Sequence, residues 1–161
     1  MKKIWVIVAD EAIVRVMSRS DIPGAPLDAV QALTDPAAHG KDEAFHHDAH
    51  GRRAASAPRG HSASQPVVAA GASATTSAGE SGRHIEAEQF ARRVAEFLRG
   101  ALNEGRFDEL HIAAAPRFLG LLRKALDPQV AKRVVQSLDK DWTKADDADL
   151  AQWFFPRPAA A

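Results

Sequence analysis

The sequence contains no cysteine, which excludes disulfide bonds, thiolate nucleophiles and zinc sites built from thiolates. Its formal net charge is zero, so a nucleic-acid or membrane partner would need a local charged patch. Long hydrophobic runs are absent too, because the apolar run from Ile4 to Ala9 is cut by Asp10 and Glu11. This run is too short for the core of a signal peptide or for a membrane span of ~20 residues. We therefore expect a cytoplasmic protein with no membrane partner.

Large apolar side chains are scarce between residues 35 and 82. This stretch consists mostly of alanine, glycine, serine, histidine and arginine, with Phe45 and two valines as exceptions. Such a segment cannot bury enough apolar surface to offset the conformational entropy lost on ordering. We predict a mobile, low-complexity insertion loop over 35–82 within a single domain of residues 1–155, followed by a flexible tail at 156–161.

Five short segments have the pattern of β-strands. Apolar and β-branched residues fill Ile4–Ala9 on both faces, which is typical of a central strand covered on each side. A short polar break separates it from Ala12–Ser18, and this arrangement predicts a hairpin. Further strands are expected at Leu27–Leu33, Leu110–Ala115 and Val134–Leu138.

The clearest helix is expected over residues 84–105, where apolar residues recur at helical spacing from Ile85 onward and a glycine marks the end. Pro116 suits the first turn of a second helix, and Asp127 suits the N-cap of a short third one. A terminal helix is expected at 147–155. Three aromatic residues of this helix are expected to pack on the sheet: Trp153, Phe154 and Phe155. The order of elements predicts an α/β fold, with a mixed β-sheet of about five strands flanked by helices.

Asp10 and Arg117 are candidates for an anion-binding site. Asp10 ends the first predicted strand, and Arg117 follows the fourth. Ligands of open α/β sheets gather outside the carboxyl ends of parallel strands, so the two residues share a crevice if these strands are neighbours. The alanines at 113–115 would let a ligand approach closely, and an arginine beside a helix N-terminus suits a phosphate or carboxylate. The alternative is structural: Asp10 caps a turn and pairs with Arg117, while the alanines only fill a tight helix–sheet contact.

A local excess of positive charge lies at residues 117–133, where five cations face a single acid, Asp127. The cations are Arg117, Arg123, Lys124, Lys132 and Arg133. They predict a face that contacts the phosphates of transfer RNA or ribosomal RNA; the alternative is a solvated helix face near the acids of residues 139–149. Lys140 is a further candidate that would join the anion site, although a turn with a buried Trp142 also explains this stretch.

Histidines cluster in the predicted loop, where His46, His47 and His50 stand near Asp48. These side chains are suitable zinc ligands, but a zinc site needs convergent geometry and supporting hydrogen bonds, which a mobile loop does not supply. We therefore favour adventitious metal binding and expect no cofactor. The sequence also contains no G-x-S-x-G nucleophile elbow and no phosphate-binding P-loop, so no motif supports hydrolase chemistry.

Four stretches of the sequence resemble the bacterial host-attachment protein family: WVIVADEAIVRV, HIEAEQFARRVAEFL, FDELHIAAAPRFLGLLRKAL and VVQSLDKDWT. Members of this family are similar in turn to the middle, catalytic-type domain of archaeal and eukaryotic peptide release factors and of their ribosome-rescue relatives. The resemblance implies the RNase H-like topology of that domain.

Two positions depart from these patterns. The family usually has a glycine after the aspartate that ends the first strand, where this chain has Glu11. Release factors carry a Gly-Gly-Gln tip on the loop before their long helix, and its glutamine places water at the peptidyl ester. The loop here has no such triplet, and its only glutamine is Gln65. Peptide-release activity is therefore not carried over by the resemblance.

We accordingly predict a release-factor-like, non-catalytic module that binds transfer RNA, ribosomal RNA or the ribosome through its 117–133 face. The rival hypothesis is a regulatory interaction protein that affects attachment to host cells indirectly and binds a protein partner through the 35–82 loop. A third hypothesis is a loop-dependent esterase acting on peptidyl-transfer RNA, for which Gln65 would be the residue to replace.

Overall fold

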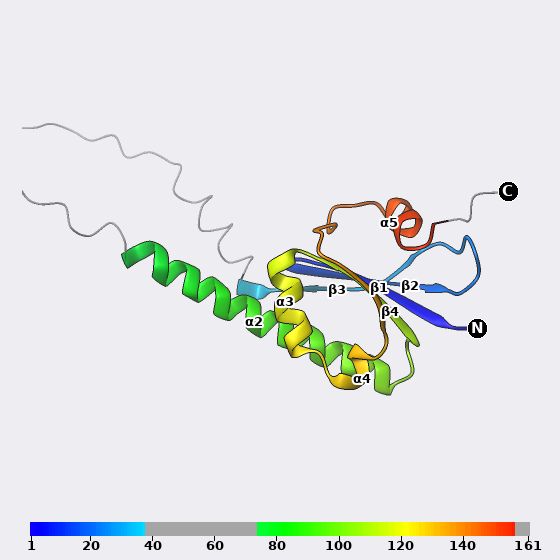
Figure 1. Ribbon diagram of the computed structural model, residues 1–161, viewed down its shortest axis with the longest axis horizontal. Helices are drawn as coiled ribbons and strands as arrows, with labels where there is room; N and C mark the ends of the chain where they lie inside the picture. Colours follow the sequence, from blue (N-terminus) through cyan, green and yellow to red (C-terminus); the bar gives the residue numbers. More distant parts are fainter. Residues whose placement is uncertain (38–73, 157–161) are drawn as a thin grey trace, which may run out of the picture.

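The computed structural model describes residues 1–37 and 74–156, and within these ranges five strands form one mixed sheet with helices on both faces (Figure 1). The strands are β1 (Lys3–Ala9), β2 (Ile13–Ser20), β3 (Asp28–Thr34), β4 (Glu109–Ala114) and β5 (Val134–Leu138). The helices are α2 (Ala74–Asn103), α3 (Pro116–Ala125), α4 (Pro128–Ala131) and α5 (Asp147–Phe154). The predicted α/β fold is confirmed. Neither described range contains a helix that is long and apolar enough to cross a membrane.

The strands lie in the order β3-β2-β1-β4-β5. β1 pairs antiparallel with β2, and β2 pairs antiparallel with β3, which confirms the predicted hairpin. β4 runs parallel to β1, and β5 runs parallel to β4. The carboxyl ends of β1 and β4 therefore open on the same border of the sheet, where open α/β sheets bind ligands.

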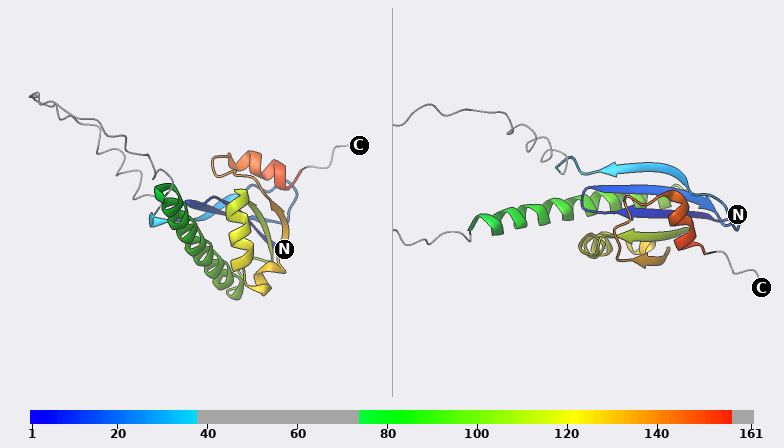
Figure 2. Two further views of the ribbon diagram at one scale, coloured as in Figure 1. Left: turned by 60° about the vertical axis from the view of Figure 1, so that its left-hand side comes forward. Right: turned by 90° about the horizontal axis from the view of Figure 1, so that it is seen from above.

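Side chains of β1 alternate between two apolar layers, as expected for a covered central strand. Trp5 and Ile7 belong to the core beneath α2, α3 and α4. Val6 and Val8 lie on the other face, in a smaller core with Leu150 of α5. Figures 1 and 2 show this layered arrangement, with α2 and α3 on one side of the sheet and α5 on the other.

Helix α2 begins at Ala74, ten residues before the predicted start, so the expected loop over 35–82 is wrong in its last part. Residues 79 and 82 are glycines, and nothing in residues 74–82 has the apolar periodicity that marks a core-facing helix. The N-terminal part of the helix projects beyond the sheet (Figure 2). Ile85, expected on the apolar face, is 55% exposed. The other loop residues, 38–73, and the tail residues 157–161 lie outside the described residues.

The C-terminal end of α2 has the predicted glycine stop. Gly105 has a φ angle of 64°, a left-handed conformation that glycine adopts without a Cβ clash. The Gly105 amide donates to the carbonyl of Leu102 at 2.9 Å, and the Arg106 amide donates to that of Ala101 at 2.9 Å. These two bonds form a Schellman motif, which satisfies carbonyls left free at the helix end.

The shorter helices begin as their sequences predict. Pro116 occupies the first position of α3, and the Asp127 carboxylate caps α4 by accepting from the Gln129 amide at 2.8 Å. In α5, Leu150 and Phe154 are buried on the sheet. The expectation that Trp153 also packs on the sheet is wrong, because its ring lies at the flank of the helix against Trp142 and is 55% exposed.

Candidate functional site

The carboxyl ends of β1 and β4 bring Asp10 and Arg117 to one border of the sheet. The parallel register pairs Ala9 with Ala114, and the Ala115 amide donates to the Ala9 carbonyl at 3.0 Å. Asp10 directly follows β1, and Arg117 stands at the second position of α3. The sequence predicted a shared crevice if β1 and β4 were neighbours. They are neighbours, so this condition is met.

Asp10 organises the turn of the β1–β2 hairpin. One carboxylate oxygen, Oδ1, accepts from the amides of Ala12 and Ile13 at 2.7 and 2.8 Å. The other oxygen, Oδ2, lies 3.5 Å from the Thr143 hydroxyl, which donates to Asp141 at 2.7 Å. Oδ1 of Asp10 thus holds the hairpin turn, and only Oδ2 faces the border of the sheet that Asp10 shares with Arg117.

Arg117 pairs with Glu11 rather than with Asp10, contrary to the structural alternative drawn from the sequence. Its Nε lies 3.6 Å from Glu11 Oε1, and its Nη2 lies 3.4 Å from Nδ1 of His84 on α2. Both members of the ion pair are substantially exposed, so it adds little to stability. The carboxylate of Glu11 instead occupies the position that an anionic ligand of Arg117 would take.

Glu11→Gln is therefore expected to strengthen phosphate binding at Arg117. Removing a carboxylate next to the guanidinium changes the local electrostatic energy by about 1 kcal/mol in a water-like medium, which corresponds to roughly fivefold tighter binding. Titration with pyrophosphate, followed through the Arg117 Nε–H NMR signal, measures this affinity. Glu104→Gln removes a comparable exposed carboxylate near Arg106 and serves as the control. Equal affinities for Glu11→Gln and the unmodified protein would contradict the assignment.

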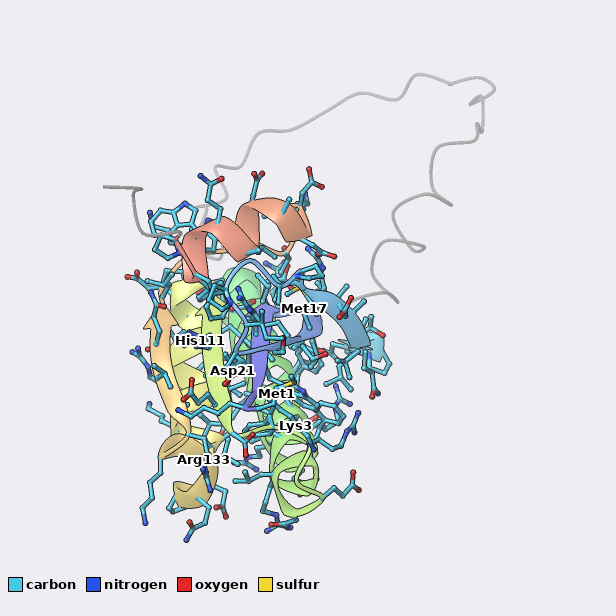
Figure 3. The ribbon with its side chains drawn as sticks, turned by 90° about the vertical axis from the view of Figure 1, so that its right-hand side faces the viewer. Met1, Lys3, Met17, Asp21, His111 and Arg133 are labelled. Atoms are coloured by element: carbon cyan, nitrogen blue, oxygen red, sulfur yellow. The ribbon has the colours of Figure 1, made fainter. Side chains whose placement is uncertain are left out.

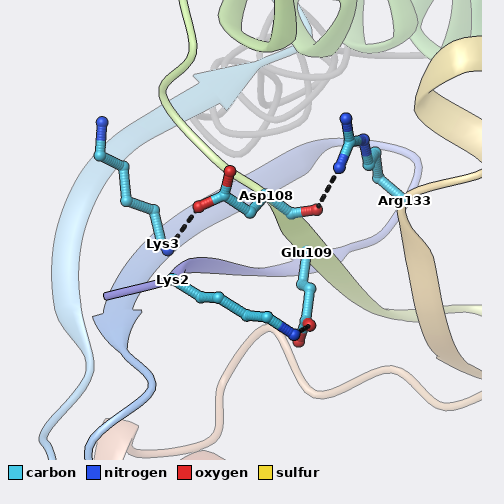
Figure 4. A network of polar contacts seen from close by, with 5 residues as sticks. All are labelled: Lys2, Lys3, Asp108, Glu109 and Arg133. Atoms are coloured by element: carbon cyan, nitrogen blue, oxygen red, sulfur yellow. Dashed lines mark hydrogen bonds and ion pairs between the residues drawn. The ribbon is translucent and has the colours of Figure 1, made fainter.

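The other cations of the 117–133 segment lie near the ends of two helices, with Arg123 and Lys124 in the last turn of α3 and Lys132 and Arg133 directly after α4. Arg123, Lys124, Lys132 and Arg133 are all exposed. Within the described residues, none of the four forms an ion pair with a carboxylate, although Arg123 donates to the Ser137 hydroxyl of β5. Arg133 reaches the opposite border of the sheet, where it lies 3.5 Å from the Asp108 carbonyl beside the start of β1 and β4 (Figures 3 and 4). Arg117 begins α3, which is about 15 Å long, so the five cations of residues 117–133 are spread along this segment rather than gathered in one pocket. We call this set the cationic stripe.

Lys140 does not join Arg117. Its Nζ lies 5.5 Å from the ring centroid of Trp153 on α5, whereas Arg117 contacts α2 on the other face of the sheet. Trp142, expected to be buried, is partly exposed and packs against Trp153 at a centroid distance of 4.8 Å. The segment after β5 therefore belongs to the α5 side of the molecule.

Cavities next to the cationic stripe are small. Two grooves between α2 and α3, of about 190 and 210 Å³, share Arg92 and Ala125 in their walls. These volumes fall below the range of typical small-molecule pockets. Cavities of about 700 and 740 Å³ lie instead on either side of α5. These two cavities were not predicted from the sequence. Two of the three tryptophans lie within twelve residues (142 to 153), and this spacing could have indicated an aromatic surface there.

Metal-binding groups do not converge in the part of the chain that the structure describes: residues 1–37 and 74–156 contain no cluster of three or more His, Asp or Glu side chains suited to a metal ion. Glu88, four residues from His84, pairs with Arg92 at 2.7 Å. His46, His47 and His50, the weak metal candidates, lie outside the described residues, and so does Gln65.

Comparison with known proteins gives one family match. A family model described as "Protein required for attachment to host cells" matches residues 5–153. The matched range includes most of β1, all of β2 to β5 and most of α5, and hence both Asp10 and Arg117. No curated protein matches the chain.

Proposed function

The chain belongs to the family of proteins required for attachment to host cells, and from that premise we propose that it is a release-factor-like, non-catalytic module that binds RNA or the translation machinery. The mixed sheet with helices on both faces supports the release-factor-like scaffold. In this proposal the link to attachment is indirect: the protein acts on RNA or on ribosomes inside the cell, and the synthesis of surface components changes in consequence.

The stripe of cations along α3 and α4 is the observation that carries the proposal. Four exposed cations have no carboxylate partner among the described residues, and Arg117 extends the stripe to the carboxyl border of the sheet. A linear polyanion suits such a stripe better than a small anion does, because each cation can neutralise a different phosphate along the backbone.

A non-catalytic role is supported by the chemistry of the border. Asp10 commits Oδ1 to the hairpin turn, Glu11 pairs with Arg117, and Thr143 is held by Asp141. The contact between the Thr143 hydroxyl and Asp141 belongs to a local turn, because the same carboxylate oxygen also accepts from the Thr143 amide at 3.1 Å. The sequence also lacks the Gly-Gly-Gln triplet that peptide release requires.

Reversing the charge of the stripe is expected to abolish RNA binding. The variant replaces four residues by glutamate: Arg123, Lys124, Lys132 and Arg133. Filter binding to transfer RNA and to ribosomes across a salt series measures the outcome. Losing about four phosphate contacts should flatten the slope of log affinity against log salt by about 3.

A second quadruple variant controls for net charge, since it makes the same number of reversals away from the stripe. Its four exposed positions are Lys2, Arg83, Lys140 and Lys144. The proposal fails if both variants lose RNA to the same extent, or if binding by the unmodified protein is insensitive to salt.

The rival function, a regulatory protein that captures a protein partner through residues 35–82, is favoured only by the family's description. Deleting residues 40–72 separates the two, because this deletion stops short of α2. If the deletion removes a co-purifying protein while RNA affinity persists, the rival function is supported. If RNA affinity and co-purification are both unchanged, the rival function is excluded.

A further inference from the structure

A groove beside α5 is lined by two tryptophans, of which Trp142 packs partly buried against the smaller core and Trp153 is exposed. Trp142 follows β5, and Trp153 lies near the end of α5; their ring centroids are 4.8 Å apart. The groove has a volume of about 740 Å³. Leu150 and Phe154 already cover the sheet from the same helix, so the 55% exposed ring of Trp153 is available to a ligand. Exposed aromatic pairs of this kind are common at recognition surfaces.

The charge around the groove selects a cationic partner. Residues 139–149 contain five aspartates and two lysines, a formal balance of −3. Asp149 lines the groove itself, whereas Asp147 is paired with Arg15 of β2. Single-stranded nucleic acid also stacks on aromatic rings, but its phosphates would be repelled by these carboxylates.

A proline and a lysine of the chain lie at or beside this groove. Pro156 forms part of the groove wall, and the ammonium group of Lys140 lies 5.5 Å from the Trp153 ring centroid. A proline ring is an apolar, rigid partner for an indole face, and a cation is attracted by the electron density of that face. A proline thus lines the groove, and a cation lies over one of its two tryptophans.

The wall that carries Trp142 is held in place. Arg15 donates to the carbonyls of Thr143 and Ala145 at 2.9 and 2.8 Å, and Asp141 accepts from the amide of Thr143 at 3.1 Å. A groove with fixed walls loses little conformational entropy when a ligand binds.

We propose that this groove binds an extended, proline-rich peptide segment of a partner protein, with an arginine of the segment placed between Trp153 and Asp149. Proline-rich segments are already extended before they bind and dock in aromatic-lined grooves. The surface lies on the opposite face of the sheet from α2 and α3, so the inference does not depend on RNA binding by the cationic stripe.

A synthetic peptide of repeated Pro-Pro-Arg units tests this inference with the full chain. Calorimetric titration should show saturable binding, and Trp153→Ala should weaken it by about tenfold or more, as expected for losing an aromatic and cation–π contact. Val135→Ala is the matched control, because Val135 is similarly exposed, at 61%, but lies on β5 away from the groove. A peptide with alanine in place of proline, and one with glutamate in place of arginine, should both bind more weakly.

Three results would overturn the inference. The first is equal affinity of the unmodified protein and Trp153→Ala for the Pro-Pro-Arg peptide. The second is an oligothymidine that binds more tightly than the peptide and depends on Trp153. The third is peptide binding that appears only after residues 157–161 are removed, since this would make the chain's own Pro-Arg-Pro sequence at 156–158 the occupant.

Discussion

Phe118→Ala is expected to lower the free energy of unfolding by about 3–5 kcal/mol, the cost of truncating a buried phenylalanine. Phe118 lies in the first turn of α3 with 0% exposure, and its ring centroid is 5.6 Å from that of Phe90 on α2. The ring therefore joins both helices to the core beneath them. Because the free energy of unfolding of such domains is only about 5–15 kcal/mol, the variant should lose a substantial part of it.

Urea unfolding followed by circular dichroism measures this loss. Ile85→Ala on α2 is the control: it also removes a large apolar side chain, but one that is 55% exposed, so a change within about 0.5 kcal/mol is expected. Similar losses for the two variants would show that Phe118 does not anchor α3. Phe118→Ala should also weaken phosphate binding at the adjacent Arg117, because the first turn of α3 loses its anchor.

The elements that the sequence predicted best are those with a local physical cause. Ile4–Ala9 is apolar on both faces, and the structure covers it on both. Pro116 can be placed because a proline is tolerated in the first helical turn, and Gly105 because a positive φ angle ends a helix. Each of these patterns acts within a few residues, so no knowledge of the tertiary fold was required.

The errors occur where the decisive contact is distant or where the pattern is weak. The first ten residues of α2 have no apolar stripe, so hydrophobic periodicity gave no indication of the helix there. Trp153 is as hydrophobic as Phe154, and only the packing of α5 shows that Phe154 faces the sheet while Trp153 faces Trp142. Composition describes a side chain, but the direction in which it points depends on the partner element.

The candidate site was predicted in position but not in its pairing. The sequence places Asp10 and Arg117 at strand ends, and the parallel pairing of β1 with β4 brings them to one border. Which carboxylate reaches Arg117 depends on the geometry of the hairpin turn: Asp10 folds back onto the amides of the turn, and Glu11 is left to pair with the guanidinium. Turn conformation at this detail is not specified by residue type.

His111 is expected to make the protein less stable as the pH falls below about 6.5. The residue lies on β4 below α5 (Figure 3) and is 6% exposed, and neither of its ring nitrogens has a hydrogen-bond partner within the described part of the chain. Its neighbours are the rings of Phe154 and Phe155, at centroid distances of 5.7 and 4.9 Å. A proton on this imidazole would create a charge in an apolar environment.

Burial lowers the pKa of His111 below its ordinary value of 6.5, and the nearby cation of Arg19 lowers the pKa further. The polar side chain of Gln136 on β5 and the negative charge of Glu109 on β4 both favour the protonated imidazole, although neither bonds a ring nitrogen at hydrogen-bond distance, and the net shift of the pKa is downward. The unfolded chain therefore binds a proton at a higher pH than the folded protein does. The stabilisation that comes from keeping His111 neutral is present above pH 6.5 and is lost as the pH falls from there through the folded-state pKa.

His111→Phe should remove this acid sensitivity, because the substituted ring packs against the same aromatic residues and carries no ionisable group. Above pH 7 the variant should be at least as stable as the unmodified protein, since the substitution also removes two unsatisfied polar atoms. Below pH 6.5 its advantage should grow by up to about 1.4 kcal/mol per pH unit. Urea unfolding at pH 7.5, 6.5, 5.5 and 5.0 provides the comparison, with His84→Gln as the control for an exposed imidazole. Parallel stability profiles for His111→Phe and the unmodified protein would mean that His111 is protonated alike in the folded and unfolded states, and burial under α5 would then have no part in the acid response.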